Sequence, residues 1–129
     1  MTKRELDNPH SMRRDELEAI EILKRHLEEA WGPDTSSDPG AWTEGNAAWG
    51  QCAVTALIVQ DILGGKLLRA KVNGVSHYWN VIESGEEIDF TLGQFPSIDT
   101  KTEAEERTRE YVLSYPETAR RYELLWERL

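Results

Sequence analysis

The sequence predicts an α+β fold, in which a small antiparallel sheet of three or more strands packs on a central cysteine-bearing helix, with flanking N- and C-terminal helices. Three observations predict this class. Near the N-terminus, apolar residues recur at spacings of three and four, which is typical of an amphipathic helix. An apolar run follows Cys52 and ends at Gly64-Gly65. Beyond it, Asn73-Gly74 separates two strand-like runs and is a strong hairpin signal.

Length and charge limit the function classes. A chain of 129 residues is one domain, residues 1–129, with room for a buried core. Its net charge of −9 argues against nucleic acid and anionic membranes as partners, because both require clustered Lys and Arg. No apolar run is long enough to span a membrane, and the N-terminus lacks the apolar region of a secretory signal. The oligomeric state stays open.

The cysteine and histidine content is low. A single Cys cannot form an internal disulfide, which fits a reducing compartment, so we expect a cytoplasmic protein. That Cys and three His residues are scattered without ligand spacing. We therefore expect no metal site and no cofactor.

The N-terminal third is predicted to form one helix and one long loop. Residues 1–12 are polar, and we expect a flexible segment there. An amphipathic helix is predicted from about Arg13 to Trp31, where Gly32-Pro33 ends it. Residues 32–48 are turn-rich and lack periodicity, and loops of this length in compact domains often serve as lids. A loop that simply wraps the core is the open alternative. The apolar stripe of the helix comprises Leu17, Ile20, Leu23, Leu27 and Trp31.

The middle of the chain predicts the cysteine helix and three strands. The helix, Cys52 to Leu63, is apolar on most sides. Strands are predicted at residues 66–72, 75–82 and 86–91, joined by the Asn73-Gly74 hairpin and by a turn at 83–85. These segments form an antiparallel meander.

The C-terminal third predicts two helices. Thr102 followed by Glu105 is a capping-box pattern, which predicts a helix that runs to about Leu113. Pro116 suits the first turn of a last helix that reaches Leu129.

Cys52 is the first candidate for chemistry. Alone, a free cysteine in an Ala/Val-rich helix is most often a small buried filler. Its place at a helix start changes this interpretation, because the free N–H groups and the positive end of the dipole favour a thiolate. The same N–H groups, with the Gln51 amide nearby, are able to hold a developing oxyanion.

His77 and Asp89 are the candidates for a general base and its orienting acid. An imidazole is the side chain that can take a thiol proton near neutral pH. Asp89 is flanked by Ile88 and Phe90, and a carboxylate in an apolar strand is costly unless it is paired. His77, on the neighbouring predicted strand, is the nearest candidate partner.

The turn at residues 83–85 decides whether the pair can form. A two-residue loop would pair Asn80 with Asp89 and direct Asp89 to the face opposite His77. A three-residue loop with a left-handed Gly85 pairs Trp79 with Asp89 instead. His77 and Asp89 then lie on one face as diagonal neighbours, roughly 7–8 Å apart at the backbone. We predict the three-residue loop.

Four further residues are candidates for the oxyanion hole or the substrate-lining surface: Gln51, Trp49, Trp79 and Asn80. Trp79 shares its strand face with His77, where it either shields the imidazole from water or serves as a core residue. Asn80 and Gln94 either orient substrate or cap backbone groups, and capping is the favoured alternative.

Several segments resemble the YunG-like family of small bacterial proteins, whose activity is uncharacterised. The resemblance covers most of residues 31–95 and the tail around Arg120–Tyr122. The segments are Gly50-Gln51-Cys52, Asp61-Ile62-Leu63-Gly64-Gly65, His77-Tyr78-Trp79-Asn80, Ile88-Asp89-Phe90-Thr91 and Gln94-Phe95.

A wider similarity is to transglutaminase-like and papain-like cysteine enzymes. These use Cys, His and Asp or Asn in this chain order, with Gly-Gln-Cys at a helix start and His-x-Trp on the first strand. The similarity implies a cysteine-protease/transglutaminase-like core in which Cys52 is the nucleophile, His77 the general base and Asp89 the orienting acid. The chain departs from these enzymes in its short length and in Ala53, which follows the cysteine.

The leading hypothesis is a thiol hydrolase or acyltransferase that acts on an amide- or thioester-containing substrate through a Cys-His-Asp triad. Peptidase, amidase, deamidase and transglutaminase reactions share the first half-reaction and stay open. The alternative is a degenerate, non-catalytic relative that acts as a protein- or small-molecule-binding module.

Overall fold

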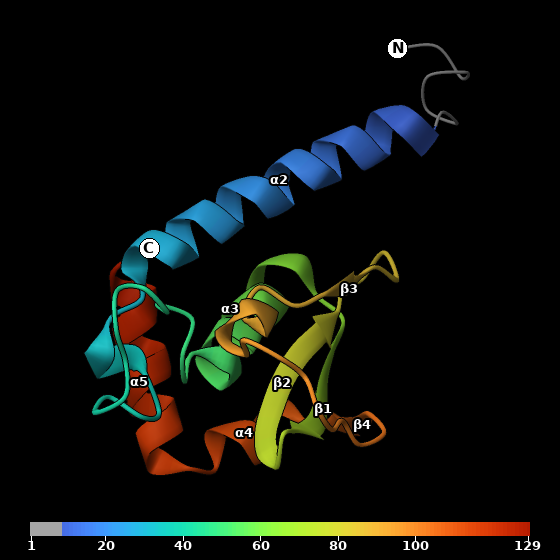
Figure 1. Ribbon diagram of the computed structural model, residues 1–129. Helices are drawn as coiled ribbons and strands as arrows, with labels where there is room; N and C mark the ends of the chain where they lie inside the picture. Colours follow the sequence, from blue (N-terminus) through green and yellow to red (C-terminus); the bar gives the residue numbers. More distant parts are fainter. Residues whose placement is uncertain (1–8) are drawn as a thin grey trace.

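The computed structural model describes residues 9–129, and within them the side chains from residue 14 onward. A four-stranded antiparallel sheet forms one layer, in the order β3-β2-β1-β4 (Figure 1). Its two long strands are joined by the predicted Asn73-Gly74 hairpin, in which both residues have positive φ, as a type I′ turn requires. The strands are β1 Lys66–Val72, β2 Val75–Val81, β3 Glu87–Ile88 and β4 Glu105–Arg107.

Helices cover this sheet, which confirms the predicted α+β class. The central helix α3 contacts β1 and β2 on one side and α5 on the other. A core cluster joins α2, α3 and α5 through residues such as Leu27, Ile58 and Leu125, each of them fully buried. The α-helices are α2 Pro9–Ala30, α3 Cys52–Leu63, α4 Arg109–Leu113 and α5 Pro116–Glu127, and the short 3₁₀ helices are η1 Pro33–Thr35 and η2 Leu92–Gln94.

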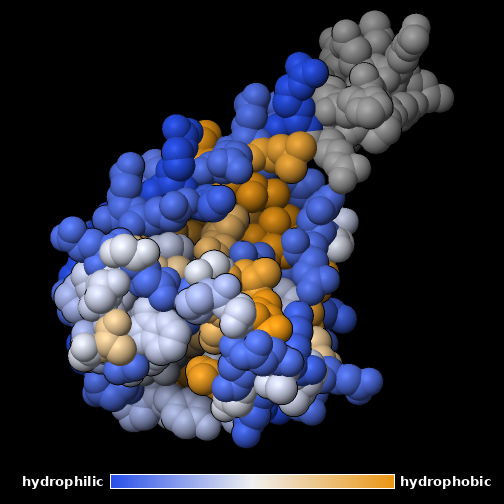
Figure 2. Space-filling model, viewed as in Figure 1, coloured by the Kyte–Doolittle hydropathy of each residue, from blue (hydrophilic) through white to orange (hydrophobic). Residues whose placement is uncertain are grey.

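Helix α2 is the longest element, and its N-terminal turns extend away from the body of the molecule (Figure 1). The predicted apolar stripe is therefore buried in part. Ile20, Leu23, Leu27 and Trp31 lie in the core, whereas Leu17 is 52% exposed. Figure 2 shows apolar side chains gathered between α2 and the body.

The expected flexible segment, residues 1–12, overlaps the start of α2, which begins at Pro9. Residues 1–8 lie outside the described residues. In the part of the chain that the structure describes, no helix has both the length and the apolar character needed to cross a membrane.

The long loop between α2 and α3 is held by hydrogen bonds. The indole Nε1 of Trp42 donates to the Ala47 carbonyl at 2.9 Å, and the amide of Asn46 donates to the Gln94 carbonyl at 3.0 Å. These contacts tie the loop to itself and to η2. Its role as a lid stays a prediction.

The helix predicted from Thr102 to Leu113 is wrong in its first half. Residues Glu105–Arg107 pair with Leu67–Arg69 and form β4, the fourth strand of the sheet. Thr102 does not cap a helix, because its hydroxyl accepts a hydrogen bond from the Lys71 amide at 2.8 Å. The helix N-cap is Thr108, whose side chain accepts from the Tyr111 amide. Pairing with an open sheet edge outweighs the local capping pattern here.

The three-residue turn before Asp89 is confirmed. Asn80 pairs with Ile88 and Val81 with Glu87, which is the predicted register. The Gly85 amide donates to the Ile82 carbonyl at 2.9 Å, with Gly85 in the left-handed region at φ 93°. Strand β3 ends at Ile88, so the predicted strand 86–91 is shorter than expected and Asp89 directly follows it.

Candidate functional site

A buried histidine and a half-buried aspartate form a pair next to the start of α3. His77 Nε2 is 2.6 Å from Asp89 Oδ2, and the histidine side chain is 1% exposed. The second carboxylate oxygen, Oδ1, accepts a hydrogen bond from the Thr91 amide at 3.2 Å. The local turn thus fixes the carboxylate, and the β2–β3 register brings it to the imidazole.

The surroundings of His77 favour its protonated form. Burial, the largest contribution, lowers the pKa of His77, but hydrogen bonding to Asp89 and Cys52 and their charges outweigh it. Together they raise the pKa of His77 from 6.5 to about 9. The charge and hydrogen bond of Asp89 thus favour the charged form of the ring.

The second ring nitrogen, Nδ1, faces the side chain of Gln94. The Gln94 side-chain Nε2 lies 3.3 Å from Nδ1, while Gln94 Oε1 accepts from the Gly50 amide at 3.1 Å. Because the Gly50 N–H requires an acceptor, it fixes the orientation of the Gln94 amide. The Gln94 amide nitrogen therefore donates toward Nδ1, and this contact favours the unprotonated nitrogen.

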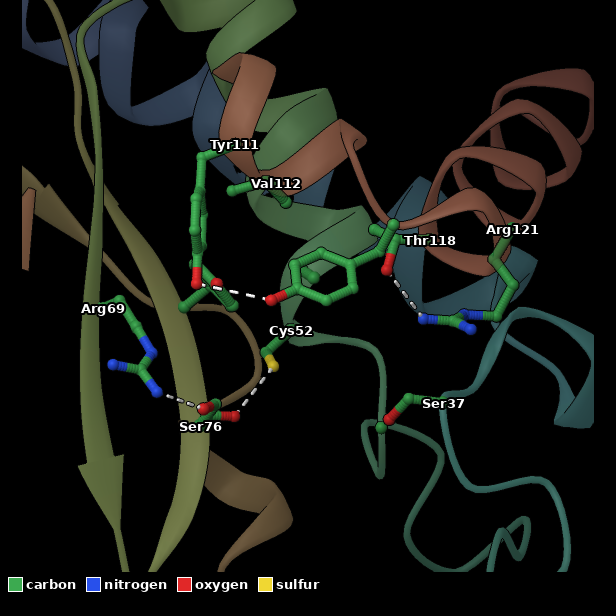
Figure 3. Close-up of a pocket in the computed structure, with 12 residues that line it drawn as sticks. Ser37, Cys52, Arg69, Ser76, Tyr111, Val112, Thr118 and Arg121 are labelled. Atoms are coloured by element: carbon green, nitrogen blue, oxygen red, sulfur yellow. Dashed lines mark hydrogen bonds between the residues drawn. The ribbon is translucent and has the colours of Figure 1, made fainter. Parts of the chain in front are cut away.

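Cys52 is the first residue of α3, and its side chain is half-buried. Its Sγ lies 3.8 Å from the carbonyl oxygen of Ser76, the residue before His77 (Figure 3). The sulfur thus reaches β2 at the position adjacent to the imidazole. Helix α3 begins here because Gly50, with φ 73°, turns the chain into it.

A cavity of about 310 Å³ opens onto Cys52. We call it the Cys52 pocket. This size falls at the lower end of the range for small-molecule sites. Figure 3 shows Cys52 between strand residues on one side and residues of the loop and α5 on the other. The lining residues are Ser37, Gly50, Cys52, Ala53, Arg69, Ser76, Tyr78, Tyr111, Val112, Tyr115, Thr118 and Arg121.

Comparison with known proteins places the chain in a family. The family model described as YunG protein matches residues 19–129. The chain belongs to the YunG family. It is 40% identical over 76 residues to YunG of Bacillus subtilis strain 168, which is described as an uncharacterised protein. That alignment spans 59% of this chain and 63% of the relative, which is less than two thirds of the relative's length. No solved structure matches the chain.

Family membership assigns no chemistry, so the function of this YunG-family chain rests on its geometry. The family model covers Cys52, His77 and Asp89. Of these three predicted residues, the structure brings His77 and Asp89 into direct contact. Cys52 lines a pocket, and its Sγ contacts the carbonyl of Ser76, the residue before His77.

Two of the predicted lining residues, Gln51 and Asn80, do not line the Cys52 pocket. Gln51 is fully buried and its Nε2 donates to the Gly32 carbonyl at 2.9 Å, which ties α3 to the end of α2. Asn80 is 2% exposed, and its Nδ2 donates to the Ala56 carbonyl at 2.9 Å. Both side chains satisfy backbone groups, which was the favoured alternative for Asn80.

The two predicted tryptophans also lie outside the pocket lining. Trp49 donates its indole N–H to Asp38 at 3.1 Å, within the long loop. Trp79 is 3% exposed and stacks on His77, with ring centroids 5.7 Å apart. Trp79 is thus a core residue that also covers the imidazole, and Phe95 contacts the same ring edge-on at 5.2 Å.

Replacing Asn80 with alanine tests whether its side chain stabilises the contact between β2 and α3. Because the substitution removes a buried hydrogen bond between β2 and α3, the free energy of unfolding should fall by about 2 kcal/mol. Cys52 alkylation by iodoacetamide should keep its rate, as Asn80 does not line the pocket. Urea unfolding and a timed alkylation assay measure the two effects. A slower alkylation without a loss of stability would instead assign Asn80 to the substrate surface.

Sequence reasoning missed Gln94 as a neighbour of His77, and it missed the arginines and tyrosines of the Cys52 pocket. Gln94 comes from η2, and the arginines and tyrosines come from β1, β2, α4, α5 and the residue before α5. No spacing in the sequence relates them to Cys52. Only the fold of the C-terminal helices over α3 brings them together.

Proposed function

We propose that this protein is a cysteine-dependent acyl-transfer enzyme in which Cys52, His77 and Asp89 act as nucleophile, general acid–base and orienting acid. The observation that carries the proposal is the His77–Asp89 pair, 2.6 Å apart, next to a cysteine that is open to a pocket. A pair that served packing alone would not require an accessible thiol beside it.

The hydrogen bond between Asp89 and His77 supports a thiolate–imidazolium pair as the reactive state of the site. Asp89 holds Nε2 and favours the doubly protonated ring. In the proposed reactive state, the Cys52 thiol transfers its proton to Nδ1 and becomes a nucleophilic thiolate. Gln94 opposes this state only weakly, since its amide is 3.3 Å from Nδ1.

In the proposed reaction, the Cys52 thiolate attacks the carbonyl carbon of an amide or thioester, and the S–C bond forms. His77 donates its Nδ1 proton to the leaving amine or thiolate as the C–N or C–S bond breaks. A thioester to Cys52 results. Water or an amine then attacks this thioester, with His77 accepting the proton, and the thiolate is restored.

The oxyanion formed in each attack requires hydrogen-bond donors. The Gln51 side chain does not serve, because it is buried and bonded to Gly32. The backbone N–H groups in the first turn of α3 lack partners within the helix and lie next to the sulfur, so we assign the role to them. The dipole of the 12-residue helix adds positive potential at the same end.

The order of the three residues and their places on a helix start and neighbouring strand segments are like those of transglutaminase-like and papain-like enzymes. This likeness is part of the proposal and favours amide or thioester chemistry. Hydrolysis, deamidation and transamidation share the thioester intermediate.

The experiment is the rate of Cys52 alkylation by iodoacetamide as a function of pH. Because His77 holds the thiol proton, Cys52 should react rapidly even at pH 6, where an ordinary thiol is protonated and slow. His77→Gln should slow the reaction at pH 6 by about 100-fold, in line with the loss of a general base. Since Cys52 is the only cysteine, mass spectrometry of the intact protein follows it directly.

A folding check and further variants accompany the alkylation experiment. Circular dichroism shows whether His77→Gln, which changes a buried residue, still folds, and Asp89→Asn provides a second variant at a half-buried position. His26→Gln, on the exposed face of α2, should leave the rate unchanged. A wild-type Cys52 that reacts at pH 6 no faster than N-acetylcysteine would overturn the enzyme proposal and favour the non-catalytic binding module.

A further inference from the structure

The Cys52 pocket has an unusual charge. The whole chain carries 24 acidic and 15 basic residues, yet the pocket is lined by two arginines, Arg69 and Arg121, and by no carboxylate. Figure 3 shows the two arginines on opposite sides of Cys52, one from β1 and one from α5. A pocket of this charge in an acidic protein attracts small anions.

Both guanidinium groups lack a carboxylate partner among the described residues. Arg69 donates to the Ser76 hydroxyl at 2.7 Å, and Arg121 donates to the Thr118 hydroxyl at 3.3 Å. The other arginines from residue 69 onward each form an ion pair, namely Arg107 with Glu105, Arg109 with Asp61, Arg120 with Glu117 and Arg128 with Asp34. The positive charges of Arg69 and Arg121 are thus not neutralised by a carboxylate of the described residues, and both guanidinium groups can bind an anion.

Arg121 also has an unused donor. Its Nε is buried and has no hydrogen-bond partner within the described part of the chain. A buried donor on a charged group that is left unpaired costs free energy, and a carboxylate oxygen is its natural acceptor. Its neighbour Glu117 does not fill this role, since it pairs with Arg120 at 3.0 Å.

We propose that the Cys52 pocket recognises an acyl donor that carries a carboxylate, which Arg121 and Arg69 bind while Cys52 attacks the nearby carbonyl. This inference rests on the proposed function and names its substrate class. The tyrosines of the wall, Tyr78, Tyr111 and Tyr115, supply flat apolar faces and hydroxyl groups for the remainder of a small substrate.

The experiment compares two alkylating probes of nearly equal size, iodoacetate and iodoacetamide. With either probe the thiolate forms an S–C bond and iodide leaves, so the two reactions differ only in the charge of the probe. We expect the iodoacetate-to-iodoacetamide rate ratio of Cys52 to exceed that of N-acetylcysteine by about tenfold at low salt. Arg121→Gln and Arg69→Gln should each reduce the ratio, and the double variant should bring it to the N-acetylcysteine value.

Arg120→Gln is the matched control, because Arg120 is the next residue on α5 but already pairs with Glu117. It should leave the ratio unchanged. Arg69→Gln is the second variant if Arg121→Gln fails to fold. A wild-type ratio equal to or below that of N-acetylcysteine, or a raised ratio that survives in the double variant, overturns the proposal.

The ratio separates this inference from the proposed function. The absolute rate at pH 6 and its dependence on His77 test the thiolate. The probe ratio tests the pocket and can also be measured at pH 9, where any accessible thiol reacts. A slow rate at pH 6 with a raised ratio at pH 9 would thus overturn catalysis but leave anion binding in place.

Discussion

Asp89→Asn is expected to destabilise the protein by about 3 kcal/mol at pH 6 and by much less at pH 9.5. In the folded state the pKa of His77 is raised from 6.5 to about 9, with Asp89 as the principal cause that opposes burial. A shift of this size corresponds to about 3 kcal/mol of net stabilisation of the charged ring, to which Asp89 makes the largest favourable contribution and Cys52 a smaller one. The asparagine keeps the size of the side chain but removes its charge.

The direction of the pH dependence follows from this shift. Stabilisation by a group with a raised folded pKa is fully present below its unfolded pKa, here 6.5, and is lost as the pH rises through about 9. The difference in unfolding free energy between wild type and Asp89→Asn should therefore shrink between pH 6.5 and 9. Urea unfolding at several pH values measures it, and NMR titration of the His77 ring reports its pKa directly.

The comparison is repeated in a Cys52→Ser background, which removes the thiol from the measurement. There the shrinking difference should persist, because it depends on the carboxylate and the ring. A difference that stays constant from pH 6 to 9.5 would mean that His77 is neutral beside Asp89, which removes the basis for a thiolate at Cys52.

The arrangement of His77 and Asp89 was predictable because it depends on short-range rules. The period of two along a strand and the preference of glycine for left-handed backbone fix the register once the loop has three residues. Gly85 supplies that preference, and the observed pairing of Asn80 with Ile88 follows from it. These local rules were sufficient to predict the arrangement because His77 and Asp89 lie on segments that are adjacent in the sequence.

The fourth strand could not be predicted in the same way. Glu105–Arg107 consists of three charged residues, without the alternation or the β-branched side chains that mark a strand. It is a strand because the free edge of β1 offers hydrogen-bond partners, and such a partner is not visible in the sequence. The same limit applies to the direction of side chains. Gln51 was predicted to line the oxyanion or substrate-binding surface, but the sequence does not show that its amide turns inward to Gly32.

The charge of the pocket is the clearest case of a property that belongs to the fold. Arg69 lies on β1 and Arg121 lies on α5, and each looks like an ordinary surface residue in its own segment. Their common feature is the absence of an acidic partner, which appears only when every neighbouring carboxylate has been placed. The net charge gives the sign of the chain as a whole but not the sign of its cavity.

Gly50→Ala is expected to lower the free energy of unfolding by about 3 kcal/mol. Gly50 has φ 73°, which costs an alanine about 1 kcal/mol or more. A Cβ there would also lie 2.2 Å from Ser36 Oγ and 2.8 Å from the Ser37 amide nitrogen. Ser36 cannot simply move, because its hydroxyl donates to the Trp49 carbonyl at 2.7 Å. Displacing this packed loop adds a further 1–3 kcal/mol, by rough estimate.

Gly74→Ala separates the strain at Gly50 from the crowding. Gly74 has nearly the same backbone angle, φ 78°, but no atom lies within 4 Å of the added carbon, so only the strain of about 1 kcal/mol should appear. Urea unfolding of both variants measures the difference. Since Gly50 and Ser37 line the Cys52 pocket, Gly50→Ala should also alter the alkylation of Cys52, and Gly74→Ala should not. Equal losses of stability in the two variants would show that the loop moves freely, and the pocket wall beside Cys52 would then be flexible rather than preformed.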